Sequence, residues 1–184
     1  PGLDAAVAVG VEEAVAWAVG AGGEVSCWTT RSPPAIVDGI TDAVQIDFGC
    51  VALANGKAAC WESSSAPVEV HGLDEVVMVS TATAQSCALS SNGEVHCWGY
   101  RGIEYQDGYD VPVYDAVPWR VEGLGDVVQI AGSKRYLTPL TDLGGMVGPG
   151  RSCALTREGS VRCWIGDEML DEPDALEAFR PPSR

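Results

Sequence analysis

Three pairs of cysteines separated by ten positions place the strongest constraint on how this chain can fold. In each interval a glycine stands six positions after the first cysteine and follows small or polar residues, as in Ser91-Asn92-Gly93. A three-residue hairpin loop needs a left-handed residue at its last position, and glycine adopts that conformation without a steric penalty. Each interval therefore predicts a β-hairpin. The pairs are Cys50 and Cys60, Cys87 and Cys97, and Cys153 and Cys163.

Folding such an interval into a hairpin brings its two cysteines opposite each other. In the interval centred on Asn92, Leu89 then faces Val95 and Cys87 faces Cys97. Facing Cα atoms of antiparallel strands lie about 4.5–5.5 Å apart, and a disulfide bridges Cα atoms about 4.4–6.8 Å apart. We therefore predict three disulfides within hairpins. Because disulfides persist in oxidising compartments, they indicate an extracellular, periplasmic or cell-surface location.

Two other uses of cysteine fit the sequence less well. Zinc sites usually contain closely spaced cysteine pairs, and a redox-active dithiol usually has the C-x-x-C pattern; neither occurs here. The seventh cysteine, Cys27, lies ten positions after Trp17, so the partner that its hairpin would supply has been lost. We expect Cys27 to be a buried free thiol or, alternatively, the attachment point of a second chain.

The hairpins recur within a longer repeat. Each unit has an apolar segment before the hairpin, such as Leu73–Val77, and a segment beginning with proline after it, such as Pro118–Gly123. Four short strands per unit, separated by turn residues, predict an all-β fold: a β-propeller or partial propeller of about four four-stranded blades in a single domain. A β-sandwich is the second choice, because it would show more polar outward positions. The units are approximately 1–39, 40–72, 73–123 and 124–184.

The residues of this repeat resemble those of a known family. Gly-Leu-x-Asp-Val-Val-x-Ile, Ser-Cys-Ala-Leu and Gly-x-Val-x-Cys-Trp are similar to the RCC1-like (regulator of chromosome condensation) repeat, in particular its cysteine-bearing version in bacterial secreted and surface proteins. The similarity is most specific in residues 84–98 and 151–164. It implies a propeller, usually of seven blades. Four units would then be part of a longer propeller, an open arc, or half of a homodimer that completes a ring.

Net charge limits the partners of such a module. The formal net charge is −15, and the pI is about 4.3. An acidic chain repels phosphate backbones, so we expect no nucleic-acid partner, and we do not extend to this chain the nucleotide-exchange and chromatin roles of the family's best-known members. Apolar runs are far shorter than the roughly 20 residues that span a bilayer, so we expect no membrane insertion.

Two insertions break the repeat and are the candidate binding regions. The first, 99–119, contains four of the chain's five tyrosines, and the second, 133–150, is its most basic segment. Tyrosine and arginine are common at interface hot spots, and loops on a rigid scaffold often bind ligands. The alternatives are an ordinary surface loop that packs its own aromatics and basic residues that pair with the chain's own carboxylates. The candidates are Tyr100, Arg101, Tyr105, Tyr109, Tyr114 and Trp119 in the first, and Lys134, Arg135 and Tyr136 in the second.

The sequence contains little that indicates catalysis. No nucleophile-elbow, P-loop, zinc-protease or dinucleotide motif occurs, and we interpret His96 as a structural residue in a hairpin strand. We expect no cofactor and no metal. The sequence therefore predicts a non-catalytic, secreted or cell-surface module that binds a protein or glycan. The alternatives are a carbohydrate-active enzyme on a propeller scaffold and a purely structural segment of a larger repeat protein.

The repeat also predicts where the last strand lies. The outer strand of the fourth unit is expected near Arg180–Pro182.

Overall fold

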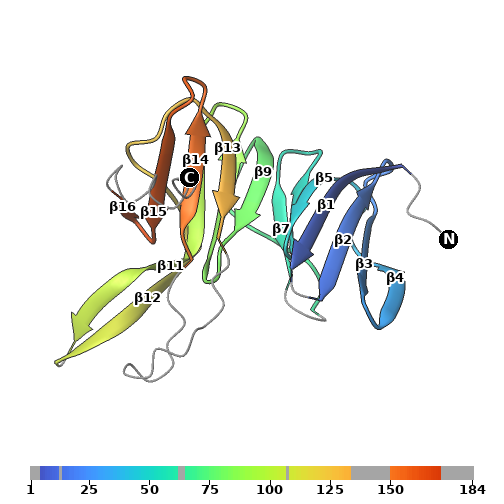
Figure 1. The fold of residues 1–184 in the computed structure, drawn as a ribbon, viewed down its shortest axis with the longest axis horizontal. Coiled ribbons are helices and arrows are strands. Elements are labelled where there is room, and N and C mark those ends of the chain that lie inside the picture. Colours follow the sequence, from blue (N-terminus) through green and yellow to red (C-terminus); the bar gives the residue numbers. More distant parts are fainter. Residues whose placement is uncertain (1–4, 13, 62–64, 107, 134–149, 171–184) are drawn as a thin grey trace, which may run out of the picture. The chain divides into compact units, whose positions relative to one another are not determined.

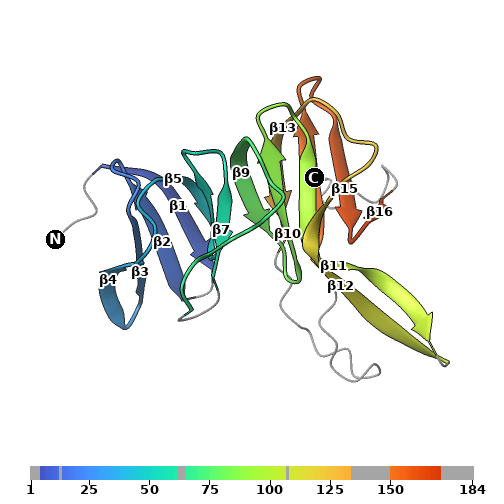
Figure 2. The ribbon, with the colours of Figure 1, turned by 180° about the vertical axis from the view of Figure 1, so that it is seen from behind.

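The computed structural model describes residues 5–12, 14–61, 65–106, 108–133 and 150–170. Within these ranges the chain forms four antiparallel sheets of four strands each and no helix. Figure 1 shows the strands in chain order, and Figure 2 shows them from behind. Sequential strands are neighbours in every sheet, which is the arrangement of propeller blades. The fold is a partial β-propeller, as predicted.

The strands of each sheet lie within one of the four predicted repeats. The first sheet contains β1 (Ala6–Glu12), β2 (Val15–Gly20), β3 (Val25–Thr29) and β4 (Ser32–Ile36). The second contains β5 (Ala43–Asp47), β6 (Cys50–Leu53), β7 (Ala58–Cys60) and β8 (Val68–Glu69). The third contains β9 (Val76–Thr81), β10 (Gln85–Ser90), β11 (Val95–Gln106) and β12 (Tyr109–Arg120). The fourth contains β13 (Val127–Gly132), β14 (Ser152–Thr156), β15 (Val161–Ile165) and β16 (Glu168–Met169).

The chain divides into two compact units, and the division passes through the third sheet. One unit contains residues 1–80 and 88–92, and the other contains residues 81–87 and 93–184. The core of the first unit is formed by buried side chains of the first two sheets and of the segment between them. These are Trp17, Val19, Val25, Ile40, Ala43, Ile46, Val51 and Ala59. Their burial supplies the main stabilisation of the pair of sheets.

The hairpin loops have the predicted conformation. In the second sheet the amide of Leu53 donates to the carbonyl of Lys57 at 2.9 Å, and Gly56 has a φ of 80°. The same loop occurs in the fourth sheet, where Thr156 donates to Ser160 and Gly159 has a φ of 87°. Glycine is required here because other residues rarely adopt this backbone conformation.

The three predicted disulfides are present. The Cα atoms lie 4.1 Å apart in Cys50–Cys60 and 4.0 Å apart in both Cys87–Cys97 and Cys153–Cys163. In the first sheet Cys27 pairs with Trp17 across the same hairpin position, so it is free and partly buried. The prediction that Cys27 had lost its partner to a tryptophan is confirmed.

One sequence-based expectation was wrong. The insertion 99–119 is not a loop: it extends β11 and β12 into a long antiparallel hairpin. In the fourth sheet the last described strand is β16, directly after the hairpin turn, and the segment near Arg180 where an outer strand was expected lies outside the described residues. β16 is short because only Trp164 and Ile165 of β15 pair with it.

Candidate functional site

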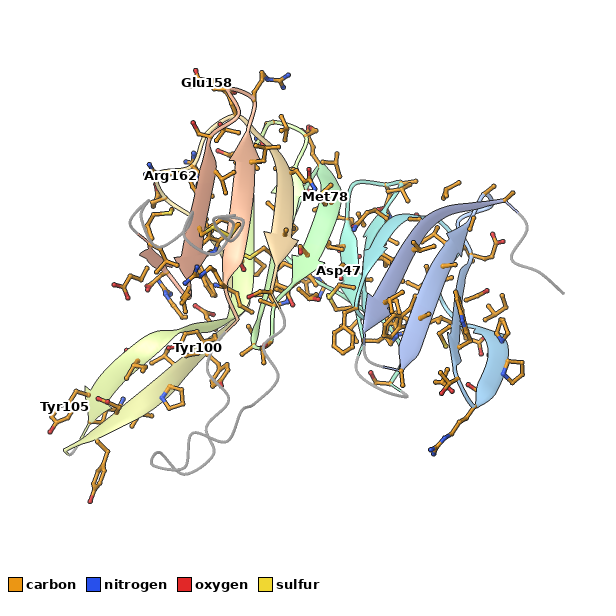
Figure 3. All side chains as sticks on the ribbon, in the orientation of Figure 1. Asp47, Met78, Tyr100, Tyr105, Glu158 and Arg162 are labelled. Atoms are coloured by element: carbon orange, nitrogen blue, oxygen red, sulfur yellow. A yellow bond between two sulfur atoms is a disulfide. The ribbon has the colours of Figure 1, made fainter. Side chains whose placement is uncertain are left out.

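Among the described residues of the second unit, most of the exposed large hydrophobic side chains lie on the extended part of the third sheet. We call residues 99–115 the arm. Its two strands remain paired from Gly99 with Asp115 to Gln106 with Tyr109 at the tip. Figure 3 shows Tyr100 at the base of the arm and Tyr105 near its tip, with the ring directed away from the ribbon. This long hairpin lies outside the body of its sheet, so both of its faces are exposed to solvent.

The local sequence explains why the arm forms strands. β-branched and aromatic residues dominate β12 from Tyr109 to Tyr114, and these residues favour extended backbone. Pro112 is tolerated because β12 is the edge strand of its sheet and needs no further ladder donor on that side. The register shifts between Tyr100 and Gly102, so Arg101 is an extra residue that forms a bulge. A bulge bends and twists a strand, and this one lies where the arm leaves the body of the sheet.

The two faces of the arm differ in chemistry. Paired residues share a face and successive residues alternate, so Tyr105, Ile103, Pro112 and Tyr114 lie on one side. We call this side the aromatic face. Its three large side chains are 75% (Tyr105), 61% (Ile103) and 63% (Tyr114) exposed.

The opposite side of the arm is more polar. It contains Glu104, Gln106 and Val111, and the Gln106 amide donates to the Glu104 carboxylate at 3.1 Å. Tyr109 also lies there and is 75% exposed. The structure therefore separates tyrosines that the sequence had grouped together.

Tyr100 is a structural residue at the base of the arm. It is buried, and its amide donates to the carbonyl of Ala84 at 2.7 Å. Its ring packs edge-on against Tyr114, with ring centroids 5.9 Å apart. Burial, with smaller contributions from Tyr114 and nearby carboxylates, raises the pKa of the Tyr100 phenol. The side chain is therefore neutral at physiological pH and serves as packing.

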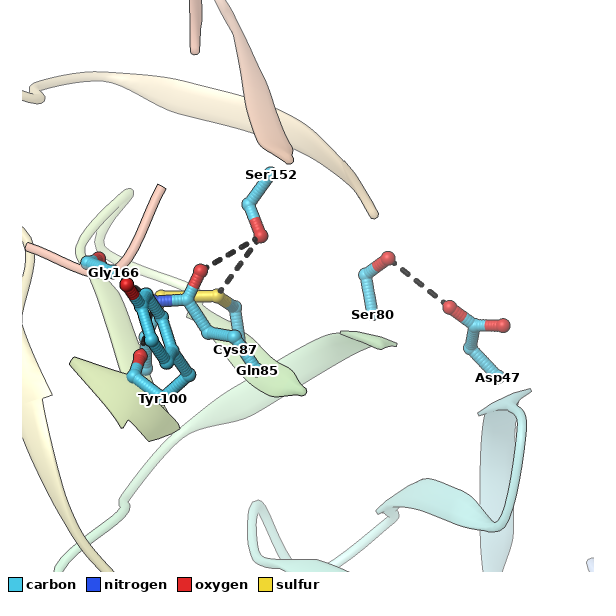
Figure 4. Close-up of a disulfide and its surroundings, with 8 residues drawn as sticks. Asp47, Ser80, Gln85, Cys87, Tyr100, Ser152 and Gly166 are labelled. Carbon is cyan, nitrogen blue, oxygen red and sulfur yellow. Dashed lines mark hydrogen bonds between the residues drawn. A yellow bond between two sulfur atoms is a disulfide. The ribbon is translucent and has the colours of Figure 1, made fainter. Parts of the chain in front are cut away.

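A buried glutamine joins the base of the arm to the fourth sheet. The Gln85 amide donates to the carbonyl of Gly166 at 2.7 Å and accepts from the Ser152 hydroxyl at 3.2 Å (Figure 4). The amide of Asp167 in the same turn donates to the carbonyl of Arg101 at 2.9 Å. Buried polar groups with every partner satisfied fix a geometry, so this network orients the arm.

Arg101 fixes the bulge from the outside. Its guanidinium lies 3.1 Å from the carboxylate of Asp115 and 3.4 Å from that of Asp167, and it stacks 5.5 Å from the ring centre of Trp119. The planar guanidinium thus contacts two carboxylates and one aromatic ring. Arg101 and Trp119 therefore position the arm and are not free contacts for a partner.

The remaining candidates are distributed as follows. Lys134, Arg135 and Tyr136 lie outside the described residues. The two histidines were not among the binding candidates: His71 is a surface residue, 3.9 Å from the carboxylate of Glu69, and His96 is partly buried in β11 opposite Arg120. Within the described ranges no three His, Cys, Asp or Glu side chains are grouped so that they could hold a metal ion.

Sequence reasoning missed two positions of the candidate site. Ile103 was not singled out, although it continues the aromatic face between Tyr105 and Tyr114. Its alternation with Tyr105 was the available signal. Gln85 was also missed, because its partners Ser152 and Gly166 are distant in sequence and give no local pattern.

Comparison with known proteins supports the fold. No protein-family model and no curated protein matches the sequence. Among solved structures, human WBSCR16 has a TM-score of 0.60 at 18% identity, over 88% of this chain and 48% of that one. Prp20p from Saccharomyces cerevisiae has a TM-score of 0.57 at 15% identity, over 82% of this chain and 41% of that one.

The chain spans slightly less than half the length of these structures.

The described residues contain no helix that could span a membrane. A further similar structure, yeast RCC1 (Prp20) bound to Kap60, has a TM-score of 0.56 over 85% of this chain. The four sheets of this chain therefore have the fold of part of an RCC1-like β-propeller.

Proposed function

We propose that this chain is a non-catalytic binding module that docks a protein partner on the aromatic face of its arm. The observation on which the proposal rests is the row of Tyr105, Ile103 and Tyr114, three large side chains that are each more than half exposed on one side of a paired ribbon. Contiguous exposed apolar surface is uncommon on monomeric proteins and marks interaction sites.

The contacts that hold the base of the arm in place favour tight binding by the aromatic face. Tyr100, Gln85 and Arg101 fix the base of the arm through buried packing, buried hydrogen bonds and paired charge. A surface that is ordered before binding loses less conformational entropy when the partner arrives. Tyrosine combines a large apolar area with a hydroxyl, which is why it is enriched at the centre of interfaces.

The net charge and the disulfides indicate the kind of partner. A net charge of −15 favours a partner whose apolar contact is surrounded by basic residues. Three disulfides suit a secreted or cell-surface location, where such a partner would be met. Protein binding is also a property of a structurally similar protein, Prp20p, which binds Gsp1p and histones.

A glycan is the second candidate ligand. The observation that favours it is Asp110, which pairs with Tyr105 on the same face of the arm. A flat aromatic ring beside a carboxylate offers both an apolar surface and a hydrogen-bond acceptor to a sugar. A glycan array and a panel of extracellular proteins, each probed with the same variants, distinguish the two ligands.

The experiment compares two faces of the same arm. One variant replaces Tyr105, Ile103 and Tyr114 by serine, and the matched control replaces Tyr109, which is equally exposed on the opposite face, by serine. The immobilised proteins are exposed to culture supernatant and to the array. We expect a ligand that is retained by the wild type and by Tyr109→Ser and lost by the triple variant. The same ligands retained on all three proteins would refute the proposal.

A further inference from the structure

An aromatic ring and carboxylates hold a guanidinium at the base of the arm. One nitrogen of the Arg101 guanidinium lies 3.1 Å from the Asp115 carboxylate, and the central carbon lies 5.5 Å from the ring centre of Trp119. A second carboxylate, that of Asp167, lies 3.4 Å away. The ring offers the flat cation an electron-rich surface, and the carboxylates neutralise its charge. The chain therefore contains a ring-and-acid site for arginine that its own side chain fills.

The tip of the arm has a ring and an acid without such a cation. Tyr105 of β11 and Asp110 of β12 are directly paired, and directly paired residues lie on the same face of a ribbon. The Tyr105 side chain is 75% exposed, and Asp110 is also exposed. Among the ion pairs formed by the described residues, none includes Asp110. This ring and this carboxylate are therefore neighbours on the exposed tip.

The register of the arm brings these two side chains close together. Two residues nearer the base, Ile103 faces Pro112, which has no N–H to donate, as suits a pair without hydrogen bonds between its members. The two kinds of pair alternate along an antiparallel ladder, so Tyr105 and Asp110 form a pair of the same kind as Ile103 and Pro112. In such pairs the facing Cα atoms are only about 4.5 Å apart. One flat cation can therefore contact both side chains.

The charge of the arm favours a cation that comes from a partner. Residues 102–114 contain three carboxylates and no lysine or arginine. One of these carboxylates, that of Glu104, lies on the opposite face and accepts a hydrogen bond from the Gln106 amide at 3.1 Å. The formal net charge of the chain is −15, so a basic partner is also attracted at longer range.

We propose that Tyr105 and Asp110 together bind an arginine side chain of the protein partner; this inference rests on the proposed function and names the chemistry of its ligand. The guanidinium stacks on the Tyr105 ring and donates hydrogen bonds to the Asp110 carboxylate. Arginine fits better than lysine because its planar head can stack on a ring and pair with a carboxylate at the same time.

The neighbouring pair of the arm indicates what accompanies the arginine. Ile103 and Pro112 are apolar and lie next to Tyr105 and Asp110 on the same face. In an extended segment, side chains two positions apart share a face. The partner segment therefore carries an apolar residue two positions from its arginine, where it packs on Ile103.

Fluorescence anisotropy of a labelled peptide that repeats Arg-Ser-Leu-Ser three times, titrated with the full chain, tests the proposal. Two further peptides replace arginine by lysine and by citrulline, which has nearly the shape of arginine but no charge. We expect the arginine peptide to bind at least about threefold more tightly than the lysine peptide and at least about tenfold more tightly than the citrulline peptide. Equal binding of all three, or no binding at about 1 mM, would overturn the proposal.

Two carboxylate variants separate this site from the general charge of the chain. Asp110→Asn should weaken binding of the arginine peptide by at least about tenfold. Glu104→Gln is the matched control, because it removes one charge from the opposite face, and it should weaken binding by less than about twofold. Both positions are exposed, so neither change disturbs packing. Equal losses would show that only the overall charge attracts the peptide, which contradicts the proposal.

Two variants of Tyr105 test the role of the ring. Tyr105→Phe keeps an aromatic surface and should bind the arginine peptide like the wild type. Tyr105→Leu keeps an apolar side chain without a ring, and it should weaken binding by about threefold. Unchanged binding by Tyr105→Leu would contradict stacking of the guanidinium.

The ligand that the aromatic face retains distinguishes this inference from the proposed function. A protein ligand that is lost with both Asp110→Asn and the triple variant of the aromatic face supports both. A protein ligand that is lost with the triple variant but retained with Asp110→Asn keeps the proposed function and overturns the arginine site. A glycan lost with Asp110→Asn, without any preference for the arginine peptide, would assign the pair to a sugar and also overturn it.

Discussion

The disulfide-linked hairpins and the arm are built from the same element, two antiparallel strands joined by a short turn, yet they are stabilised in different ways. The hairpin of β6 and β7 is short, has a disulfide across it, and has buried residues such as Val51, Ala52 and Ala58 on both faces. The arm has exposed residues on both faces and is fixed only at its base. A disulfide-linked hairpin that forms part of a core occurs in three of the four sheets, whereas the exposed extension occurs in one.

The largest change in the free energy of unfolding is expected when a disulfide is removed. We expect the double variant Cys87→Ala and Cys97→Ala to lower the free energy of unfolding by about 2–3 kcal/mol, because the closed loop restricts the unfolded chain. Chemical denaturation measures the loss. The hairpin of Trp17 and Cys27 supplies the control: Cys27→Ala removes no cross-link and should cost about 1 kcal/mol or less. Equal losses in both would mean that side-chain packing, and not the cross-link, stabilises these hairpins.

A smaller loss is expected at the buried amide below the arm. Gln85→Leu keeps the volume but leaves the carbonyl of Gly166 without its donor and the Ser152 hydroxyl without its acceptor. Unsatisfied buried groups cost about 1–3 kcal/mol. Hydrogen exchange should show faster exchange at Arg101 and Asp167, whose backbones meet beside this network, and no change in the first sheet. Uniform acceleration throughout the chain would contradict a local role for Gln85.

Much of the fold was predictable because its determinants are local. Ten positions between Cys153 and Cys163, with Gly159 at the left-handed position, fix a hairpin and its register without reference to the rest of the chain. The free state of Cys27 followed from the same rule, since Trp17 occupies the position of its partner.

The arm was missed for the opposite reason. The bulge at Arg101 shifts the register, Pro112 interrupts the alternation, and Gly99 and Gly102 are typical of loops. The sequence identified the tyrosines as candidates but not the faces on which they lie. The face on which a side chain lies depends on how the strands pair. The role of Gln85 depends on its hydrogen bond to Gly166, 81 positions along the chain. Neither leaves a periodic pattern in the sequence.

A still smaller effect is expected from the charge at the base of the arm. Arg101→Met removes two partly exposed ion pairs, with Asp115 and Asp167, and the contact with Trp119. Exposed ion pairs contribute little, so the loss of stability should be about 1 kcal/mol. It should shrink further at high salt, which screens the charges. A loss that is unchanged by salt would show that packing of the Arg101 side chain on Trp119 is the main contribution.

The smallest effect on stability is expected at the tip, and it distinguishes the arm most clearly from the other hairpins. Tyr105 and Tyr109 are each 75% exposed, on opposite faces, so replacing either by serine should change the free energy of unfolding by less than about 0.5 kcal/mol. Equal and negligible losses of unfolding free energy would show that neither ring contributes to the stability of the fold. A loss near 2 kcal/mol at Tyr105 alone would mean that its ring packs against the body of the protein, and the aromatic face would then be part of the fold and not a docking surface.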